Sequence, residues 1–210
     1  MDATQRDSDS SSLSEAAMAA DPMTQFARWM SDAEALVRPE PTAMVLATAA
    51  ADGRPRARTV LLKAHDQSGF TFYSNRTSRK GLDIAANPLV CVVFPWYAMQ
   101  RQVTAEGSVV TMSREDSEPY FRSRPRGSQI GAWASRQSQI IGSRDELDRR
   151  VEELEQRWPP ATSIPMPDFW GGYLLVPETV EFWQGGQYRL HDRLRYRRHD
   201  DRWIIERLSP

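Results

Sequence analysis

The first patterned part of the chain is an apolar stripe at helical spacing. Asp21 can cap a helix, and Pro22 suits the first helical position because the backbone nitrogen there needs no hydrogen-bond partner. The stripe predicts an amphipathic helix that packs on a sheet. It comprises Phe26, Met30, Ala33 and Val37.

Short apolar runs bounded by turn residues predict strands after this helix. The first two are joined at Asp52-Gly53, a common hairpin turn. Ser78 predicts a capped helix over residues 79–86 that ends before Asn87-Pro88. The strands are expected at residues 43–48, 57–63, 70–73, 89–94 and 101–110.

Helix starts and turn residues organise the second half of the chain. Ser113 begins a helix in which Pro119 predicts a kink, and Ser143 begins a helix with an apolar stripe over residues 147–158. Residues 122–142 lack a sustained period, so we expect an ordered loop with helical turns. Further strands are expected at residues 172–176, 179–184, 188–196 and 203–208.

Many short strands with few long helices favour a closed, antiparallel β-barrel with peripheral helices over a Rossmann sheet. The predicted fold class is therefore mostly β, within the α+β class. A chain of 210 residues can fill one core, so we expect a single domain over residues 21–210. Residues 1–20 are rich in Ser, Asp and Ala, and we expect a disordered tail there.

Charge and cysteine content narrow the class of protein. The formal net charge of -1 argues against a general nucleic-acid binder, and we interpret the basic run at residues 193–199 as a solvated strand face. Cys91 is the only cysteine, so no intramolecular disulfide can form. The chain lacks a signal peptide and any apolar stretch near ~20 residues, so we expect a soluble cytoplasmic protein.

Several common catalytic signatures are absent from the sequence. These include the glycine-rich dinucleotide fingerprint, the Walker loop, the zinc-protease motif and the serine-hydrolase motif. The three histidines and the single cysteine are not clustered in the sequence, so we expect no metal site.

A short cationic row follows the turn residues Gly185-Gly186. A strand with a side-chain period of two would place Arg189, His191 and Arg193 on one face. These groups repel one another unless an anion lies in front of them, so the row predicts a site for a phosphorylated ligand. The alternative is a solvated edge strand, because edges often carry arginine and lysine.

A second candidate anion site lies where the capped helix begins. Arg79 and Lys80 follow Ser78 directly, so two cations and several free backbone donors converge at one helix end. This arrangement suits a phosphate. The alternative is an ordinary helix surface.

The segment Glu181-Phe-Trp-Gln-Gly-Gly-Gln-Tyr-Arg-Leu-His-Asp-Arg193 closely resembles the C-terminal signature of the pyridoxine/pyridoxamine 5'-phosphate oxidases. These are flavoenzymes of the FMN-binding split-barrel class. The resemblance runs from about Asp21 to the C-terminal Arg-Leu-Ser-Pro. Matching blocks are Arg58–Lys63, Phe72–Asn75, Gln100–Val103, Tyr120–Trp133 and Ser135–Ser138.

The resemblance implies FMN as the cofactor. Alternation along the first matching block would send Arg58 and Lys63 to opposite faces, so that one contacts flavin and the other substrate. The residues that match FMN contacts are Arg58, Thr59, Val60, Leu61, Leu62, Lys63, Tyr73, Ser74, Arg79, Lys80, Gln102, Gln137, Ser138, Trp183 and Arg193.

The resemblance also implies a substrate site with two parts. Arg189 and His191 match catalytic residues over the pyridine ring, and Leu190 lies between them. A two-residue turn at Gly185-Gly186 would put Trp183 on the face opposite Arg189, so either the loop is bulged or two subunits share the site. The residues that match the grip on the substrate phosphate are Lys63, Tyr120, Arg124 and Ser128.

Two positions depart from the family pattern. The family's N-terminal Arg-x-x-Tyr lid segment is missing, since only Arg6 and no tyrosine precede Asp21. Glu40 stands where relatives often have Asp, which lengthens the reach of the carboxylate without changing its chemistry.

The implied function is the FMN-dependent oxidation of pyridoxamine or pyridoxine 5'-phosphate to pyridoxal 5'-phosphate, a step of vitamin B6 metabolism. Dioxygen is the implied acceptor, giving hydrogen peroxide, and the amine substrate also gives ammonia. A homodimer with FMN at its interface is expected. The alternatives are another split-barrel flavin oxidase of the phenazine-biosynthesis type, or a non-catalytic module that binds flavin, pyridoxal phosphate or nucleic acid.

Overall fold

The computed structural model describes residues 12–210, which form two compact units. Unit 1 comprises the described residues up to Pro41, together with Val93–Ala105 and Glu178–Pro210. Unit 2 comprises Thr42–Val92 and Glu106–Pro177. Both units are built from segments far apart in sequence. That residues 21–210 act as one domain stays a prediction.

The strands pair antiparallel in every recorded register, as the sequence predicts. Their hydrogen-bonded order is β2-β1-β5-β6-β7-β4-β3, and β8 and β9 follow on β7. The short strand β3 is an element that the sequence pattern does not predict. The bounds are β1 (Ala43–Ala49), β2 (Pro55–Leu61), β3 (Ala64–Asp66), β4 (Gly69–Asn75), β5 (Leu89–Trp96), β6 (Arg101–Thr111), β7 (Trp170–Gln184), β8 (Asp192–His199) and β9 (Arg202–Arg207).

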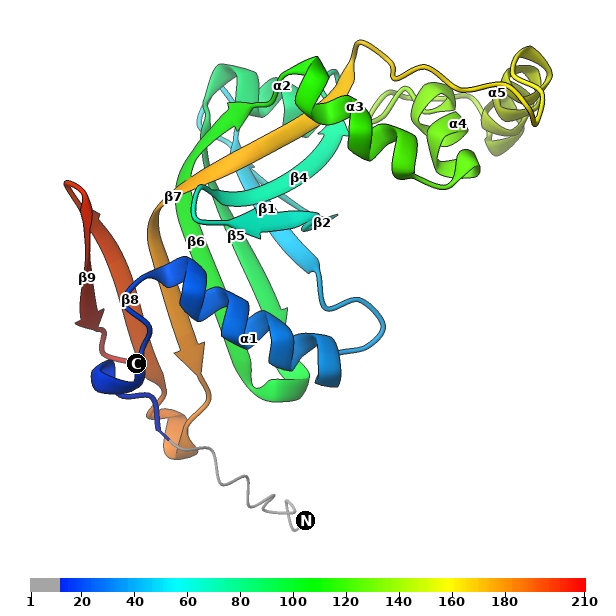
Figure 1. Ribbon diagram of the computed structural model, residues 1–210. Coiled ribbons are helices and arrows are strands. Elements are labelled where there is room, and N and C mark those ends of the chain that lie inside the picture. The colour runs from blue at the N-terminus through cyan, green and yellow to red at the C-terminus, as the bar shows by residue number, and fades with distance from the viewer. Residues whose placement is uncertain (1–11) are drawn as a thin grey trace. The chain divides into compact units, whose positions relative to one another are not determined.

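Unit 1 has an aromatic core under helix α1 (Pro22–Leu36), which lies along its part of β5 and β7 (Figure 1). The ring centroid of Phe26 is 4.9 Å from that of Phe94, and the ring of Trp29 meets Phe182 edge-on at 5.1 Å. The Asp21 carboxylate accepts a hydrogen bond from the Thr24 amide at 2.8 Å. Both the predicted cap and the predicted apolar face are confirmed.

Unit 2 contains four helices among its described residues: α2 (Arg79–Ala86), α3 (Arg114–Ser123), α4 (Arg126–Ala134) and α5 (Arg144–Arg157). The predicted serine caps of α2, α3 and α5 each accept a backbone hydrogen bond, which confirms those three starts. Helix α3 runs through Pro119.

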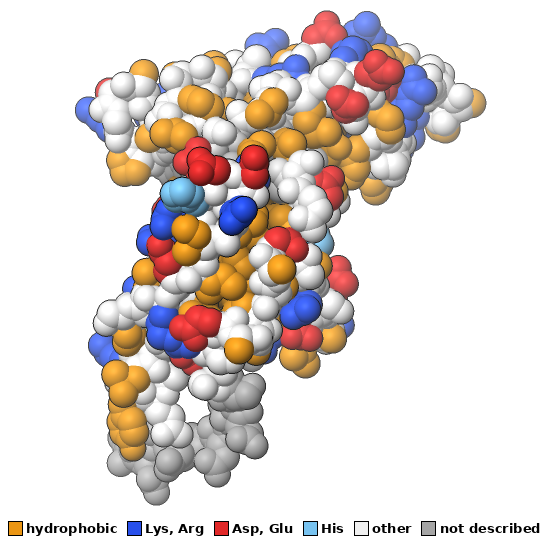
Figure 2. Space-filling model, turned by 60° about the vertical axis from the view of Figure 1, so that its left-hand side comes forward, with side chains coloured by type: hydrophobic (Ala, Val, Ile, Leu, Met, Phe, Trp, Pro, Cys, Tyr) orange, Lys and Arg blue, Asp and Glu red, His pale blue; other side chains and the backbone are white. Residues whose placement is uncertain are grey.

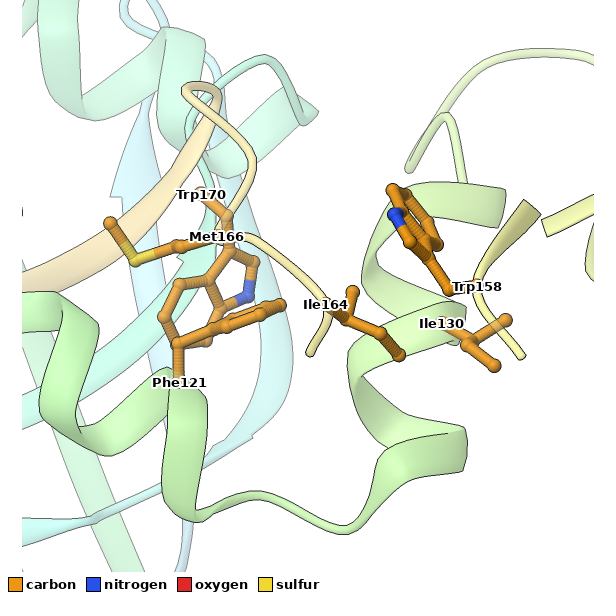
Figure 3. Packing of buried hydrophobic residues seen from close by; sticks show 6 residues of the cluster. All are labelled: Phe121, Ile130, Trp158, Ile164, Met166 and Trp170. Carbon is orange, nitrogen blue, oxygen red and sulfur yellow. The ribbon is translucent and has the colours of Figure 1, made fainter. Parts of the chain in front are cut away.

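Helix α4 corrects the prediction of a loop with helical turns over residues 122–142. No side chain caps its start at Pro125, and Gly127 and Gly131 weaken its helical pattern. Burial of Ile130 and Ala134 holds the helix in place instead. Figure 3 shows Ile130 on α4 with the other members of its buried cluster, which are Phe121, Trp158, Ile164, Met166 and Trp170.

The C-terminal strands differ from the prediction in two ways. The segments predicted as separate strands at residues 172–176 and 179–184 belong to one strand, β7. Strand β8 begins only at Asp192, because Tyr188 and Arg189 adopt left-handed backbone angles with φ of 55° and 65°. The prediction that Arg189, His191 and Arg193 line one strand face is therefore wrong.

The connection between β7 and β8 is wider than a two-residue turn. Trp183 pairs with Arg193 and Gln184 with Asp192, so residues 185–191 form the loop. The two-residue turn is therefore not formed, and whether two subunits share the site stays a prediction.

Residues 12–20 contact the C-terminal strands. The Leu13 amide donates to Asp192 Oδ2 at 3.0 Å, Arg207 Nε donates to Glu15 Oε1 at 2.9 Å, and the Tyr196 hydroxyl donates to the Ala19 carbonyl at 2.8 Å. This part of the predicted tail is therefore ordered, and residues 1–11 lie outside the described part. No described helix has the length and apolar character that a membrane crossing needs.

Candidate functional site

Unit 2 contains an open cavity of ≈ 510 Å³ whose wall includes β2, β4 and the start of α2. All of its lining residues except Trp170 are predicted site residues. They are Arg58, Thr59, Val60, Leu61, Lys63, Tyr73, Ser74, Arg79, Lys80, Tyr120, Arg124, Gln137, Ser138 and Trp170.

The start of α2 presents two cations and a polar network to the cavity. Lys80 is only 8% exposed, and its Nζ donates to Ser74 Oγ at 3.0 Å and to Gln137 Oε1 at 2.7 Å. The Arg79 amide donates to Ser138 Oγ at 3.2 Å. The structure thus brings together five predicted cofactor contacts from three separate segments.

The positive charge of this cavity is not balanced by its own lining. No aspartate or glutamate occurs among the described residues that line it. Burial, with a smaller contribution from the positive charge of Arg58, lowers the pKa of Lys80 to about 8. A bound phosphate would offset this charge and would accept from the free backbone donors of the helix start.

A stack of aromatic rings forms another part of the wall. The ring of Tyr73 lies 4.1 Å from that of Tyr120 and 5.2 Å from that of Trp170, in both cases stacked. Arg124 Cζ lies 5.0 Å from the Trp170 ring centroid, within the range of a cation–π contact. Trp170 is not among the predicted site residues, because a lone aromatic residue beside Gly171 has no distinguishing local signal.

Arg124 brings a buried, unsatisfied nitrogen to the cavity. Its Nη1 is buried and has no hydrogen-bond partner among the described residues. Burial lowers its pKa, against a smaller opposing effect of Tyr120. A buried donor without a partner costs free energy unless a ligand satisfies it, so Arg124 points to an anionic ligand here.

Three further predicted positions of unit 2 need comment. Lys63 lines the same cavity as Arg58, so the prediction of opposite faces is wrong; β2 ends at Leu61, and strand alternation stops before Lys63. Leu62 is buried outside the lining. Ser128 is exposed on α4 and is not brought to the cavity.

The remaining predicted contacts belong to unit 1. Gln102 Nε2 donates to Thr104 Oγ1 at 3.3 Å. The rings of Trp183 and His191 lie 4.6 Å apart, and His191 Nδ1 accepts from the Gly186 amide at 3.1 Å. Arg189 and Leu190 are exposed in the loop between β7 and β8.

Arg193 is already engaged within unit 1. Its Nε and Nη2 donate to the two carboxylate oxygens of Glu181 at 2.7 and 3.0 Å, a bidentate pair. The hydrogen bonds to Glu181 raise the pKa of Arg193. No local pattern in the sequence predicts Glu181 as the partner of Arg193.

Comparison with known proteins identifies the class of fold. The structure of PhzG from Burkholderia lata 383, in complex with tetrahydrophenazine-1-carboxylic acid, matches with a TM-score of 0.85 and 29% identity over 91% of this chain and 94% of that chain. A pyridoxamine 5'-phosphate oxidase-related, FMN binding protein from Nostoc punctiforme shares the fold, with a TM-score of 0.70 and 16% identity over 89% of this chain and 96% of that chain. The predicted antiparallel split barrel is confirmed.

The sequence comparisons then show the family. Residues 30–158 match the family described as pyridoxamine 5'-phosphate oxidase, and residues 170–210 match the pyridoxine 5'-phosphate oxidase C-terminal dimerisation region. A pyridoxine/pyridoxamine 5'-phosphate oxidase from Frankia alni is 62% identical over 89% of this chain and 79% of its own length. One from Acidothermus cellulolyticus is 55% identical over 94% of this chain and 90% of its own length. The chain belongs to the pyridoxine/pyridoxamine 5'-phosphate oxidase family and is an enzyme.

Proposed function

We propose that the protein is an FMN-dependent oxidase that converts pyridoxamine or pyridoxine 5'-phosphate to pyridoxal 5'-phosphate, with dioxygen as the acceptor. The observation that carries this proposal is the cavity of unit 2, which is lined by two groups of side chains that could each bind a phosphate. Arg79 and Lys80 form one group, and Lys63, Tyr120 and Arg124 form the other. A cofactor and a substrate that each carry a phosphate account for both.

The first group would hold the cofactor. The Arg79 and Lys80 side chains and the backbone donors at the start of α2 would bind the flavin phosphate. Ser74, Gln137 and Ser138 would complete this contact, since all three line the cavity. When bound, FMN supplies a hydride acceptor that dioxygen can reoxidise, with hydrogen peroxide as the product.

The second group would hold and orient the substrate. Lys63, Tyr120 and Arg124, with Ser128 as a further proposed contact, would bind its phosphate and place its C4' carbon for hydride loss. The alcohol substrate then yields the aldehyde directly. The amine substrate yields an imine, which water hydrolyses to the aldehyde and ammonia.

Arg189, Leu190 and His191 would contact the pyridine ring. Arg189 would stabilise negative charge that develops on the substrate, as a fixed cation does in many enzymes. Because His191 Nδ1 accepts a backbone hydrogen bond, the neutral imidazole carries its proton on Nε2. This nitrogen would donate to the substrate.

We infer a homodimer with FMN at the subunit interface. Residues 170–210 match a dimerisation region, and they contain Trp183, Arg189, His191 and Arg193. A dimer would explain why proposed contacts with flavin and substrate are divided between the two units of the chain.

A phenazine-type oxidase is the second candidate function. The similarity to PhzG supports it. The higher identity to relatives named pyridoxine/pyridoxamine 5'-phosphate oxidase, and the cationic group around Arg124, favour a B6 phosphate. A nucleic-acid-binding module has less support, because acidic and basic side chains are interspersed on the face shown in Figure 2.

Flavin content and peroxide production test these alternatives. The purified protein is expected to be yellow, to hold about one FMN per chain, and to form peroxide with the two B6 phosphates but poorly with unphosphorylated pyridoxamine. Turnover of tetrahydrophenazine-1-carboxylic acid, the compound bound in the PhzG structure, with no turnover of B6 phosphates would favour the second candidate. A colourless protein that binds nucleic acid at low salt would contradict both oxidase functions.

A further inference from the structure

Asp83 is a buried carboxylate on α2, one turn beyond Arg79 and Lys80. Its side chain is 4% exposed. Oδ1 accepts from Arg56 Nη1 at 2.8 Å, and Oδ2 accepts from the Thr48 hydroxyl at 2.8 Å. Burying a carboxylate is costly unless it is paired and hydrogen-bonded, and here both oxygens are engaged.

The same carboxylate faces Arg58, which lines the cavity. Arg58 Nη2 lies 3.7 Å from Asp83 Oδ2. Arg58 Nη1 donates to the Thr48 hydroxyl at 2.8 Å and to the Leu46 carbonyl at 3.0 Å. The Thr48 hydroxyl thus accepts from the arginine and donates to the carboxylate, so Arg58 is held by a connected network.

We propose that Asp83 is a positioning residue for the flavin: through Thr48 and its own charge it fixes the Arg58 guanidinium on the cavity wall. This inference rests on the proposed function, because it takes FMN as the occupant of the cavity. Asp83 also joins β2 to the helix whose first turn would bind the flavin phosphate. One side chain would thereby set the geometry between Arg58 and the phosphate site.

Two other roles for Asp83 predict different results. A carboxylate that acts only through its charge would weaken the attraction of the cavity for an anion, so its removal would tighten FMN binding. A carboxylate that only stabilises the fold would lower the melting temperature when removed, with the flavin release rate unchanged. Positioning predicts faster release, and this effect must depend on Arg58.

The test is the rate of FMN release from the holoenzyme after dilution, measured by the rise in flavin fluorescence. We expect Asp83→Asn to release FMN about tenfold faster, since a hydrogen bond to a charged group is typically worth that much or more. In an Arg58→Gln background the same substitution should change the rate by less than about twofold. Arg56→Gln is the matched control, because it breaks the other ion pair of Asp83 at a residue outside the cavity lining.

Thr48→Val keeps the carboxylate and removes the bridging hydroxyl, so it decides the question if Asp83→Asn fails to fold. We expect it to speed FMN release severalfold. Release at the wild-type rate or slower in the folded variants, or an equal acceleration with and without Arg58, would overturn the inference. A wild-type protein that carries no FMN would instead overturn the proposed function.

Discussion

Two groups of cationic side chains in this protein differ in how many carboxylates surround them. The first group consists of four arginines on β8 and β9 of unit 1, and each of the four is paired with a carboxylate. Arg193 pairs with Glu181, Arg195 and Arg197 share Glu206, and Arg207 contacts both Glu15 and Asp192.

In the cavity of unit 2, Arg58 faces the carboxylate of Asp83, but no ion pair is recorded for Lys80 or Arg124 within the described part of the chain. Lys80 donates to neutral oxygens of Ser74, Ser78 and Gln137, and Arg124 keeps a buried Nη1 without a partner among the described residues. Because unpaired buried charge is costly, a cavity of this kind is explained best by an anionic ligand. Sequence spacing does not distinguish these groups, whereas the carboxylates around them do.

The largest effect should follow from removing the cations at the start of α2. We expect the double variant Arg79→Ala/Lys80→Ala to bind FMN on the order of a hundredfold to ten-thousandfold more weakly, because two charge-assisted contacts are lost. Flavin content after gel filtration measures this. The matched control, Arg195→Ala/Arg197→Ala, removes two paired arginines and should stay yellow. Full FMN retention in the first variant would remove the proposed phosphate site.

A smaller effect is expected at the loop between β7 and β8. Alanine at Arg189 or His191 should give a folded, yellow enzyme whose kcat/KM is lower on the order of tenfold to a hundredfold. Steady-state peroxide production measures this. If Arg189→Ala were colourless and regained normal activity when FMN was added, the residue would serve the cofactor instead of the substrate.

The affinity for FMN should depend on pH through the titration of Lys80. Its pKa is lowered to about 8 by burial, so the free protein loses this positive charge as the pH rises through that value. A bound phosphate favours charged Lys80 and raises its pKa, so FMN affinity should fall severalfold between about pH 7 and about pH 9. Equilibrium titrations measure the fall. Lys80→Met should lack this step, and a flat profile in the wild type would contradict the assignment.

The smallest effect should come from the paired arginines of unit 1. Hydrogen bonds from Arg195 and Arg197 lower the pKa of Glu206. Its contribution to stability is therefore present above the ordinary carboxylate pKa and is lost as the pH falls through the lowered value. Glu206→Gln should lower the Tm by at most a few degrees at neutral pH, with less effect in acid and none on flavin content. Flavin loss in this variant would show that the two groups of cations are not independent.

Local sequence signals predicted some elements residue by residue. Helix α2 has the expected bounds because the residues that start and end it are its neighbours in the sequence. Ser78 caps its start, and Asn87-Pro88 follows its end. The cavity lining was predicted through the family resemblance, whose blocks supply nearly all of it.

Features that depend on distant residues could not be predicted. Arg58 pairs with Asp83, and Arg193 pairs with Glu181, in each case on a different secondary-structure element. No local sequence pattern marks these partners. The left-handed backbone at Tyr188 is likewise set by the loop around it, since the residue is not a glycine. For these reasons the sequence indicated an anion site near Arg193 but did not reveal that this arginine is already paired.

The most direct test of the unpaired cavity cations is the coupling between Arg124 and the substrate phosphate. It is obtained from kcat/KM for pyridoxamine 5'-phosphate and for pyridoxamine, in the wild type and in Arg124→Ala. We expect the phosphorylated substrate to lose on the order of tenfold to a few hundredfold, and the unphosphorylated one to change little. Arg122→Ala, which removes an exposed arginine paired with Glu118, is the matched control and should change neither. Equal losses for both substrates in Arg124→Ala, or no loss, would contradict the assignment of the cavity to a phosphorylated substrate.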